Sequence, residues 1–474
     1  MFIGKNSELS RRAFLRRSSQ LAAMGAASSY AMGLAGIGEA AAFSSAGGYK
    51  ALVCIFLYGG NDHGNTLIPF DADNYTSYSN IRGGGGAQEG GGIALSRASL
   101  ANTVLSTPQD QTLTDGITYA LAPTMARMKS RFDQGSLAPL LNVGPLVAPM
   151  TRAQFDNGSV PAPPKLFSHN DQQSTWQSSQ PEGALSGWGG RMADLAQSSN
   201  TNSMFTAINA SGNAVFLSGE EALPYRVSAN GATLVRPLDR NRLYNSSDAA
   251  SALDTIMRSA SGHVFAADYV DVNNRSLEFG AFINDALDNS TVNTDFGSEN
   301  ALAAQLRTVA QLIGARGSVG VTRQVFLVGM GGFDNHDGLI GQHEGLLSQL
   351  DFAMDAFYQA TQELGVADQV TTFTASDFGR TLASNGDGSD HGWGGHHFIL
   401  GGAVNGGRFY GRAPHVSVDT ADQVGRGRLL PDTSVDEYSS TLAQWFGVSQ
   451  SELPSVSPNI GRFASPDLGF MQPS

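Results

Sequence analysis

The chain has 474 residues, of which 41% are hydrophobic and 15% are charged, and it contains 57 glycines and one cysteine. This composition is typical of a globular, loop-rich protein of one or two domains, and it excludes a disordered chain and a disulfide-rich fold. The net charge of −13, with basic clusters confined to the N-terminus, argues against nucleic-acid binding.

Residues 1–42 have the layout of a secretory signal. The pair Arg11-Arg12 is followed by a weakly apolar run rich in Ala and Gly over residues 21–37, and three alanines then offer a cleavage site before Phe43. An arginine pair is typical of the twin-arginine pathway. We therefore expect export by the twin-arginine translocase to a bacterial periplasm or beyond the cell. Glycines interrupt the weakly apolar run, and this argues against a stable membrane anchor.

Apolar runs and helical patterns alternate along the mature chain. Four apolar or β-branched runs without polar alternation predict buried strands at residues 51–57, 137–143, 323–329 and 371–374. A fifth apolar run begins at Phe398. Patterns of helical period lie at residues 121–132, 339–364 and 435–446. This alternation predicts an α/β fold with a mostly parallel central sheet flanked by helices.

The mature chain is interpreted as a single domain, residues 43–474. Residues 71–118 are rich in Gly, Ser, Asn and Asp, which predicts a long insertion over the surface. A further short strand is expected at residues 214–217. His263 stands alone in the middle of the chain and is interpreted as a structural histidine rather than a ligand.

Carboxylate and imidazole side chains follow the ends of the predicted strands. These candidate metal ligands are Asp62, Asp334, His336, Asp377, His391 and His396. The carboxyl ends of parallel strands meet at one edge of a sheet, where α/β proteins form their sites. Because carboxylate and imidazole are ligands of Zn²⁺, Mn²⁺ and related ions, the sequence predicts a site for one or two divalent metal ions at that edge.

Three further side chains have predicted roles in catalysis. Ser168 and His169 follow the second strand at longer range, and Arg380 follows Asp377. Two ions a few ångströms apart can clamp a phosphate or sulfate group while a serine or an activated water attacks it. Arg380 is expected to hold an anionic oxygen of the substrate through two hydrogen bonds.

The order of these motifs resembles a known family. Together with the arginine pair, the segments LYGGNDHGNTLIP, SHNDQQ, GGFDNHDG, TASDFGRT and DHGWGGHHFILGG are similar to an exported bacterial family known as domain of unknown function 1501. The resemblance covers nearly the whole mature chain. That family in turn resembles the alkaline phosphatase and sulfatase superfamily. This second resemblance implies an α/β fold of the same type that binds zinc, manganese or calcium.

The resemblance also implies roles for single residues. Asp62 matches the first metal aspartate, and Ser168 is the best match for the nucleophile, with Ser174 and Thr175 as alternatives. Asp334 and His336 match a later aspartate–histidine pair of metal ligands in the superfamily, and His343 is an alternative to His336.

The end of the pattern departs from the superfamily. Asp377 matches an aspartate ligand and His391 or His396 the last histidine. Phe378 stands where the superfamily usually has a ligand His or Asn. The second metal position therefore depends on His391.

Three functions are compatible with these features. The first is an exported metal-dependent hydrolase of phosphate or sulfate esters, acting on a small anionic ester. The second is a non-catalytic exported envelope or binding protein on the same fold, which the substitution at Phe378 favours. The third is an oxidase that uses copper or iron, because histidine-rich sites also bind those ions.

Overall fold

The computed structural model describes residues 43–44, 48–83, 92–212, 214–229, 231–232, 236–259 and 264–473. The predicted signal of residues 1–42, the glycine-rich residues 84–91 and His263 lie outside the described residues. Within the described ranges, no helix is long and apolar enough to cross a membrane.

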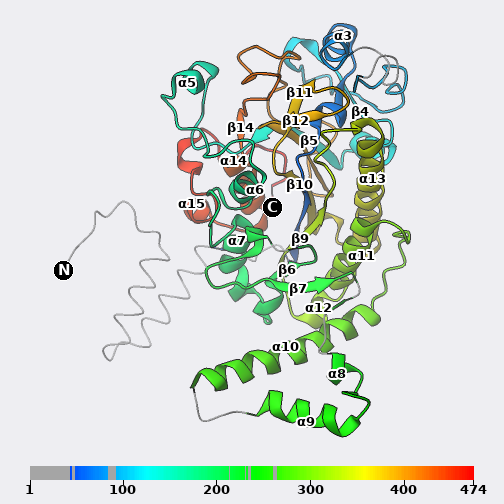
Figure 1. Ribbon diagram of the computed structural model, residues 1–474, viewed down its shortest axis with the longest axis vertical. Coiled ribbons are helices and arrows are strands. Elements are labelled where there is room, and N and C mark those ends of the chain that lie inside the picture. Colours follow the sequence, from blue (N-terminus) through cyan, green and yellow to red (C-terminus); the bar gives the residue numbers. More distant parts are fainter. Residues whose placement is uncertain are drawn as a thin grey trace, which may run out of the picture.

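A nine-stranded sheet forms the centre of the protein, in the order β14-β5-β13-β10-β1-β9-β6-β7-β8 (Figure 1). Its strands are β1 (Lys50–Leu57), β5 (Leu137–Gly144), β6 (Ala207–Asn209), β7 (Tyr225–Ser228), β8 (Gly231–Ala232), β9 (Arg323–Met330), β10 (Val370–Ser376), β13 (Gly395–Gly401) and β14 (Thr433–Ser434). The neighbours from β10 through β1, β9 and β6 to β7 run parallel, whereas β13 is antiparallel to both β10 and β5. The predicted mostly parallel α/β fold is confirmed.

Strand β1 lies in the middle of the parallel part, and all of its residues are buried. Its alternate side chains face two separate cores. Val53 and Ile55 belong to one core and Cys54 and Phe56 to the other. Since neither face of this strand meets water, its sequence is apolar from Ala51 to Leu57, as expected for a parallel strand covered on both sides.

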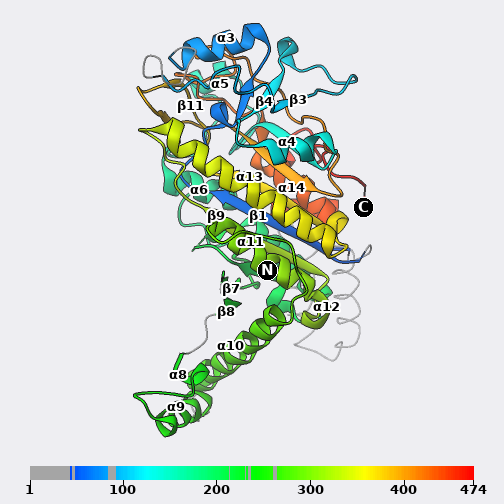
Figure 2. The same cartoon turned by 90° about the vertical axis from the view of Figure 1, so that its right-hand side faces the viewer.

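Helices cover both faces of the sheet (Figure 1). The core on the Val53 side is closed by α4 (Ala126–Asp133), α11 (Ala301–Gly314) and α13 (Leu339–Glu363). The core on the Cys54 side is closed by α6 (His169–Ser178), α7 (Trp188–Ala196) and α14 (Val435–Phe446). The helices α9 (Ser247–Arg258) and α10 (Val264–Asp288) project away from the sheet as an arm (Figure 2).

The strand register brings the candidate loops together. Leu57, at the end of β1, lies opposite Ser376 of β10 and Met330 of β9, so these three parallel strands end side by side. Because β13 runs the other way, its first residue, Gly395, lies at the same edge as the ends of its neighbours. The loops that carry Asp334, Asp377 and His391 therefore converge there.

Two predicted elements differ from the structure. Helix α4 begins at Ala126 rather than near residue 121, because Tyr119–Leu121 forms the strand β4, which pairs with β2 (Leu67–Pro69). Residues Val215–Leu217 form a short 3-10 turn rather than a strand.

The insertion at residues 71–118 is more regular than expected. It contains the helix α3 (Ala72–Ile81), whose start is capped by Asp71, and it contributes β3 (Val104–Leu105) to a small sheet with β2 and β4. The carboxylate of Asp71 accepts a hydrogen bond from the backbone N–H of Asn74. The polar and glycine-rich composition around Asp71 made the start of this helix difficult to predict from the sequence.

Candidate metal centre

Four polar side chains meet at the edge of the sheet where β9 and β10 end. Asp334 and His336 lie in the loop after β9. His169 is the first residue of α6, and His391 is the last residue of β12 (Ser389–His391) in the excursion that precedes β13. We refer to Asp334, His169, His336 and His391 as the histidine–aspartate cluster.

The carboxylate of Asp334 is the centre of this cluster. Its Oδ1 lies 3.1 Å from Nε2 of His336 and 3.1 Å from Nε2 of His391, and its Oδ2 lies 3.4 Å from Nε2 of His169. The Nε2 atoms of His336 and His391 are 2.9 Å apart. In a tetrahedral zinc site with bonds of about 2.0–2.1 Å, ligand atoms lie about 3.4 Å from one another. The spacing in the cluster is thus close to that of a metal-ligand set.

Two of the imidazoles are held by acceptors on their outer side. Nδ1 of His169 lies 2.7 Å from Oδ2 of Asp377, and Nδ1 of His391 lies 2.7 Å from the carbonyl oxygen of Phe167. In both cases Nδ1–H donates to the acceptor and Nε2 keeps its lone pair toward Asp334. This outer carboxylate or carbonyl is the usual partner of a metal-bound histidine, because it fixes the tautomer and the ring orientation.

The third imidazole, His336, is held more loosely. Its Nδ1 lies 3.5 Å from Oδ1 of Asp390, and its side chain is 39% exposed. The Asp390 carboxylate is itself paired with Arg426 at 2.8 Å. A proton or a cation must lie between the Nε2 atoms of His336 and His391, since two imidazole lone pairs at 2.9 Å repel each other.

A second observation, made at Asp377, indicates that the site suits a positively charged ion. Its side chain is fully buried, and its Oδ2 accepts from His169 and, at 2.8 Å, from Nε2 of Gln173. In the described part of the chain, its Oδ1 has no hydrogen-bond partner although it is buried. A buried carboxylate oxygen without a partner is rare and costly unless a cation or a water satisfies it. The residues present therefore fit a divalent metal ion.

The electrostatics of the cluster also suit a cation. Burial raises the pKa of Asp334, but the hydrogen bond and the charge of Arg380, together with the nearby imidazoles, outweigh this effect and lower the pKa overall, which keeps the carboxylate charged. Burial lowers the pKa of His391, so this imidazole is neutral and its Nε2 can bind a metal at neutral pH. Asp334 is 45% exposed, so solvent and small solutes reach the cluster.

Two predicted metal ligands lie away from the cluster. Asp62 is buried against Arg82, whose Nη2 lies 2.8 Å from its Oδ1, and it accepts a hydrogen bond from Ser389 Oγ at 2.6 Å. Burial raises the pKa of Asp62, but the Arg82 charge helps to hold it well below its usual range. His396 lies inside β13, and its Nδ1 accepts from the backbone N–H of Asn142 at 3.1 Å.

The predicted catalytic residues are placed in different ways. His169 belongs to the cluster itself. Arg380 is buried and donates to Asp334 Oδ1 at 2.8 Å and to the carbonyl of Gly59 at 3.0 Å, so it orients the carboxylate from the protein side. Ser168 is the residue before α6, and its Oγ donates to Oδ2 of Asp171 at 3.0 Å rather than to a member of the cluster.

Phe378, which stands where a ligand was expected, packs against the cluster. Its ring centroid lies 4.9 Å from that of His169 and 4.6 Å from that of His391. The ring has room because Gly60 has no side chain, since a Cβ there would lie 2.4 Å from Phe378. Phe378 thus forms an apolar floor that fixes two of the imidazoles.

Sequence reasoning missed Phe167 and Gln173, which hold groups around the cluster from outside. Phe167 contributes a carbonyl oxygen through a backbone with a φ of 72°, a left-handed conformation that is rare for a bulky residue. Gln173 contributes a side-chain amide from the second turn of α6. Backbone carbonyls and single amides have no motif by which a sequence reveals them. His343, the alternative to His336, is buried elsewhere and contacts Asn61 at 2.9 Å.

Comparison with solved structures shows distant similarities. One is described as Ps i-CgsB in complex with k-i-k-neocarrahexaose, with 8% identity over 88% of this chain and 77% of that chain and a TM-score of 0.37. Another is the lipoteichoic acid synthase LtaP from Listeria monocytogenes, with 8% identity over 86% and 74% of the two chains and a TM-score of 0.29. A third belongs to work on glycosaminoglycan metabolism by Bacteroides thetaiotaomicron, with 10% identity over 84% and 72% of the two chains and a TM-score of 0.33.

No curated protein matches the chain. The family described as "Protein of unknown function (DUF1501)" matches residues 49–437. This match spans most of the described fold, including every member of the histidine–aspartate cluster. The chain therefore belongs to the DUF1501 family.

Proposed function

We propose that the protein is an exported metal-dependent hydrolase of phosphate or sulfate esters. The observation that carries this proposal is the set of three imidazole Nε2 atoms around the Asp334 carboxylate, two of which, those of His169 and His391, have a hydrogen-bonded oxygen acceptor on the outer side of the ring. The donor set suits one Zn²⁺ or Mn²⁺ ion better than Ca²⁺, which takes six to eight oxygen ligands. The arginine pair of the N-terminal segment supports export to the periplasm or beyond by the twin-arginine translocase.

An ion held by the cluster would supply Lewis-acid activation of the ester. The protein's own residues supply the rest. Asp377 holds the proton on Nδ1 of His169, which keeps Nε2 turned toward Asp334. The start of α6 presents its positive end beside the cluster, where it favours an anionic ester. To act as the nucleophile, Ser168 must turn its Oγ away from Asp171.

A turnover assay tests this function. The mature protein, loaded with Zn²⁺ or Mn²⁺, is incubated with 4-nitrophenyl phosphate and with 4-nitrophenyl sulfate. We expect hydrolysis of at least one ester that stops when a chelator removes the ion. If Ser168 is the nucleophile, Ser168→Ala abolishes turnover without loss of bound metal.

The second candidate is a non-catalytic metal-binding protein of the cell envelope. The hydrogen bond from Ser168 to Asp171 favours it, because it points the hydroxyl of Ser168, which precedes His169 of the cluster, away from the reacting position. Metal-loaded protein that turns over neither ester would contradict the hydrolase proposal and support this candidate.

Metal affinity is expected to rise with pH. The hydrogen bond to Asp377 raises the pKa of His169, and the protonated imidazole cannot bind a metal through Nε2. Zn²⁺ affinity should therefore increase between about pH 6 and pH 8 and level off only above the usual histidine range near 6.5. In metal-free protein the same pair stabilises the fold below about pH 6.5, and this contribution is lost as the pH rises through the raised pKa.

Competition with a chelating dye at several pH values measures this dependence. Asp377→Asn should shift the rise in affinity to lower pH, because the neutral amide no longer favours the protonated imidazole. A Zn²⁺ affinity that stays constant over this range would show that His169 does not bind the ion.

A further inference from the structure

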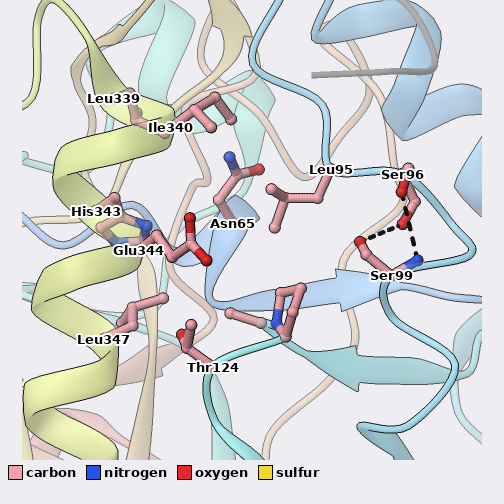
Figure 3. A pocket seen from close by; sticks show the side chains of 12 residues that line it. Asn65, Leu95, Ser96, Ser99, Thr124, Leu339, Ile340, His343, Glu344 and Leu347 are labelled. Carbon is pink, nitrogen blue, oxygen red and sulfur yellow. Dashed lines mark hydrogen bonds between the residues drawn. The ribbon is translucent and has the colours of Figure 1, made fainter. Parts of the chain in front are cut away.

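A pocket lies apart from the histidine–aspartate cluster, beside the first turns of α13. Its volume is about 300 Å³, which is within the range of small-molecule sites. Residues from α13, from the loop at residues 95–99 and from the loop at residues 122–124 form its walls (Figure 3). None of its lining residues belongs to the cluster. We call it the α13 pocket.

Half of the residues that line the α13 pocket are apolar. The apolar side chains are Leu95, Ala122, Pro123, Leu339, Ile340 and Leu347. Three of them, Leu339, Ala122 and Leu347, are buried, so they form a fixed surface rather than a mobile rim. Such a surface binds the apolar body of a ligand.

The polar groups of the pocket are hydrogen-bond acceptors or hydroxyls. Glu344 lines it with a carboxylate, and Thr124 lines it with a hydroxyl that is buried and, in the part of the chain that the structure describes, has no hydrogen-bond partner. Figure 3 shows the Glu344 carboxylate directed from α13 toward the space between the helix and the facing loops. A buried hydroxyl without a partner indicates a missing polar group at that wall.

Positive charge is absent from these walls. Among the described residues that line the pocket there is no lysine or arginine, and no ion pair of Glu344 is found in the described ranges. Burial lowers the pKa of His343 to about 4, so this imidazole is neutral, and its Nε2–H donates to Oδ1 of Asn61 at 2.9 Å. Asn65 is satisfied as well, since its amide donates to the carbonyl of Ile93 and accepts from Tyr78.

We propose that the α13 pocket binds a small primary amine with an aliphatic body. The ammonium group pairs with Glu344 and donates to the unpartnered hydroxyl of Thr124. The aliphatic body lies against Leu95, Leu339 and Leu347. An anion of the same size is excluded by the Glu344 charge, and the small volume of the pocket excludes a folded partner. This inference does not depend on the proposed hydrolase activity.

Titration calorimetry on the mature protein tests this site with three probes of one shape. Cyclohexylammonium should bind with a dissociation constant on the order of 1 mM, while cyclohexanol should bind more weakly and cyclohexanecarboxylate should not bind. Glu344→Gln should weaken binding of the amine about five-fold, as for loss of a solvent-accessible ion pair. Glu344 is exposed, so this change leaves the fold intact.

Two further variants complete the test. Thr124→Val keeps the shape of the side chain and should weaken binding by removing the hydroxyl. Glu299→Gln alters an exposed glutamate at the start of α11 and should leave binding unchanged. Equal binding of the three probes, or an unchanged affinity in Glu344→Gln, would overturn the proposal. Binding that is lost in His391→Gln instead would assign the amine to the histidine–aspartate cluster and would overturn it too.

Discussion

Asp334→Asn is expected to remove the metal ion from the purified protein and to abolish hydrolysis. Asp334 is the one residue that all three histidines of the cluster approach, at 3.1–3.4 Å. An amide supplies no negative charge, and its NH₂ group repels a cation. Loss of an outer partner of a metal ligand already costs about 10–100-fold in affinity, so loss of the central carboxylate should cost more than about 100-fold.

The same substitution should have a smaller effect on stability. Arg380 would lose its contact with Asp334 but would keep its hydrogen bonds with Gly59 and Ser389. We expect a loss of about 1–3 kcal/mol in the free energy of unfolding of metal-free protein. Metal content by elemental analysis and ester turnover are measured on the same samples.

Asp337→Asn is the matched control for Asp334→Asn. Asp337 is exposed, lies three residues further along the same loop, and is not a member of the cluster. The metal content of the Asp337→Asn variant should equal that of the unaltered protein. Asp377→Asn should give an intermediate result, with metal affinity reduced about 10–100-fold, because it acts through His169. Full metal binding by Asp334→Asn would contradict the assignment of this carboxylate as a ligand.

Asp62→Asn is expected to destabilise the protein by about 3–5 kcal/mol without removing the metal. Asp62 and Arg82 are both fully buried and form an ion pair at 2.8 Å. Removal of the carboxylate charge leaves the arginine buried without a counter-charge, which is far more costly than loss of a surface ion pair. Urea unfolding at neutral pH measures the effect.

Two variants distinguish this structural role from a role in metal binding. Asp62→Leu combined with Arg82→Met removes both charges and should recover part of the lost stability. Asp73→Asn changes an exposed aspartate in the first turn of α3 and should alter stability by no more than about 0.5 kcal/mol. Loss of bound metal with unchanged stability in Asp62→Asn would show that Asp62 is a ligand, as the superfamily resemblance implies.

The parts of the fold that the sequence predicted are those with a continuous physical signal. β1, β5, β9 and β10 contain runs of apolar or β-branched residues because they are buried on both faces. The direction of β13 has no such signal, since antiparallel and parallel strands with buried faces look alike. That direction places the start of β13, and His391 just before it, at the functional edge. His396, the second residue of the strand, is separated from the cluster because it is buried and accepts a hydrogen bond from Asn142.

The candidate site was predicted in outline but not in its contacts. The residue types and their places after strand ends indicated nine side chains. Asp334, His336, His169 and His391 converge, whereas Asp62 and His396 lie away from them. The pairing of Asp62 with Arg82 was hidden, because Arg82 lies in a glycine-rich stretch without a motif. Residues far apart in the chain, such as His169 and Asp377, meet through side-chain orientations that only the packed structure fixes.

X-ray diffraction recorded at the absorption edge of the bound metal tests the central claim most directly. On crystals of the mature protein grown with Zn²⁺, we predict one anomalous peak within about 2.0–2.2 Å of the Asp334 carboxylate and of the histidine Nε2 atoms of the cluster. Absence of a peak at Asp334, or a single peak beside Asp62 or His396, would contradict the account.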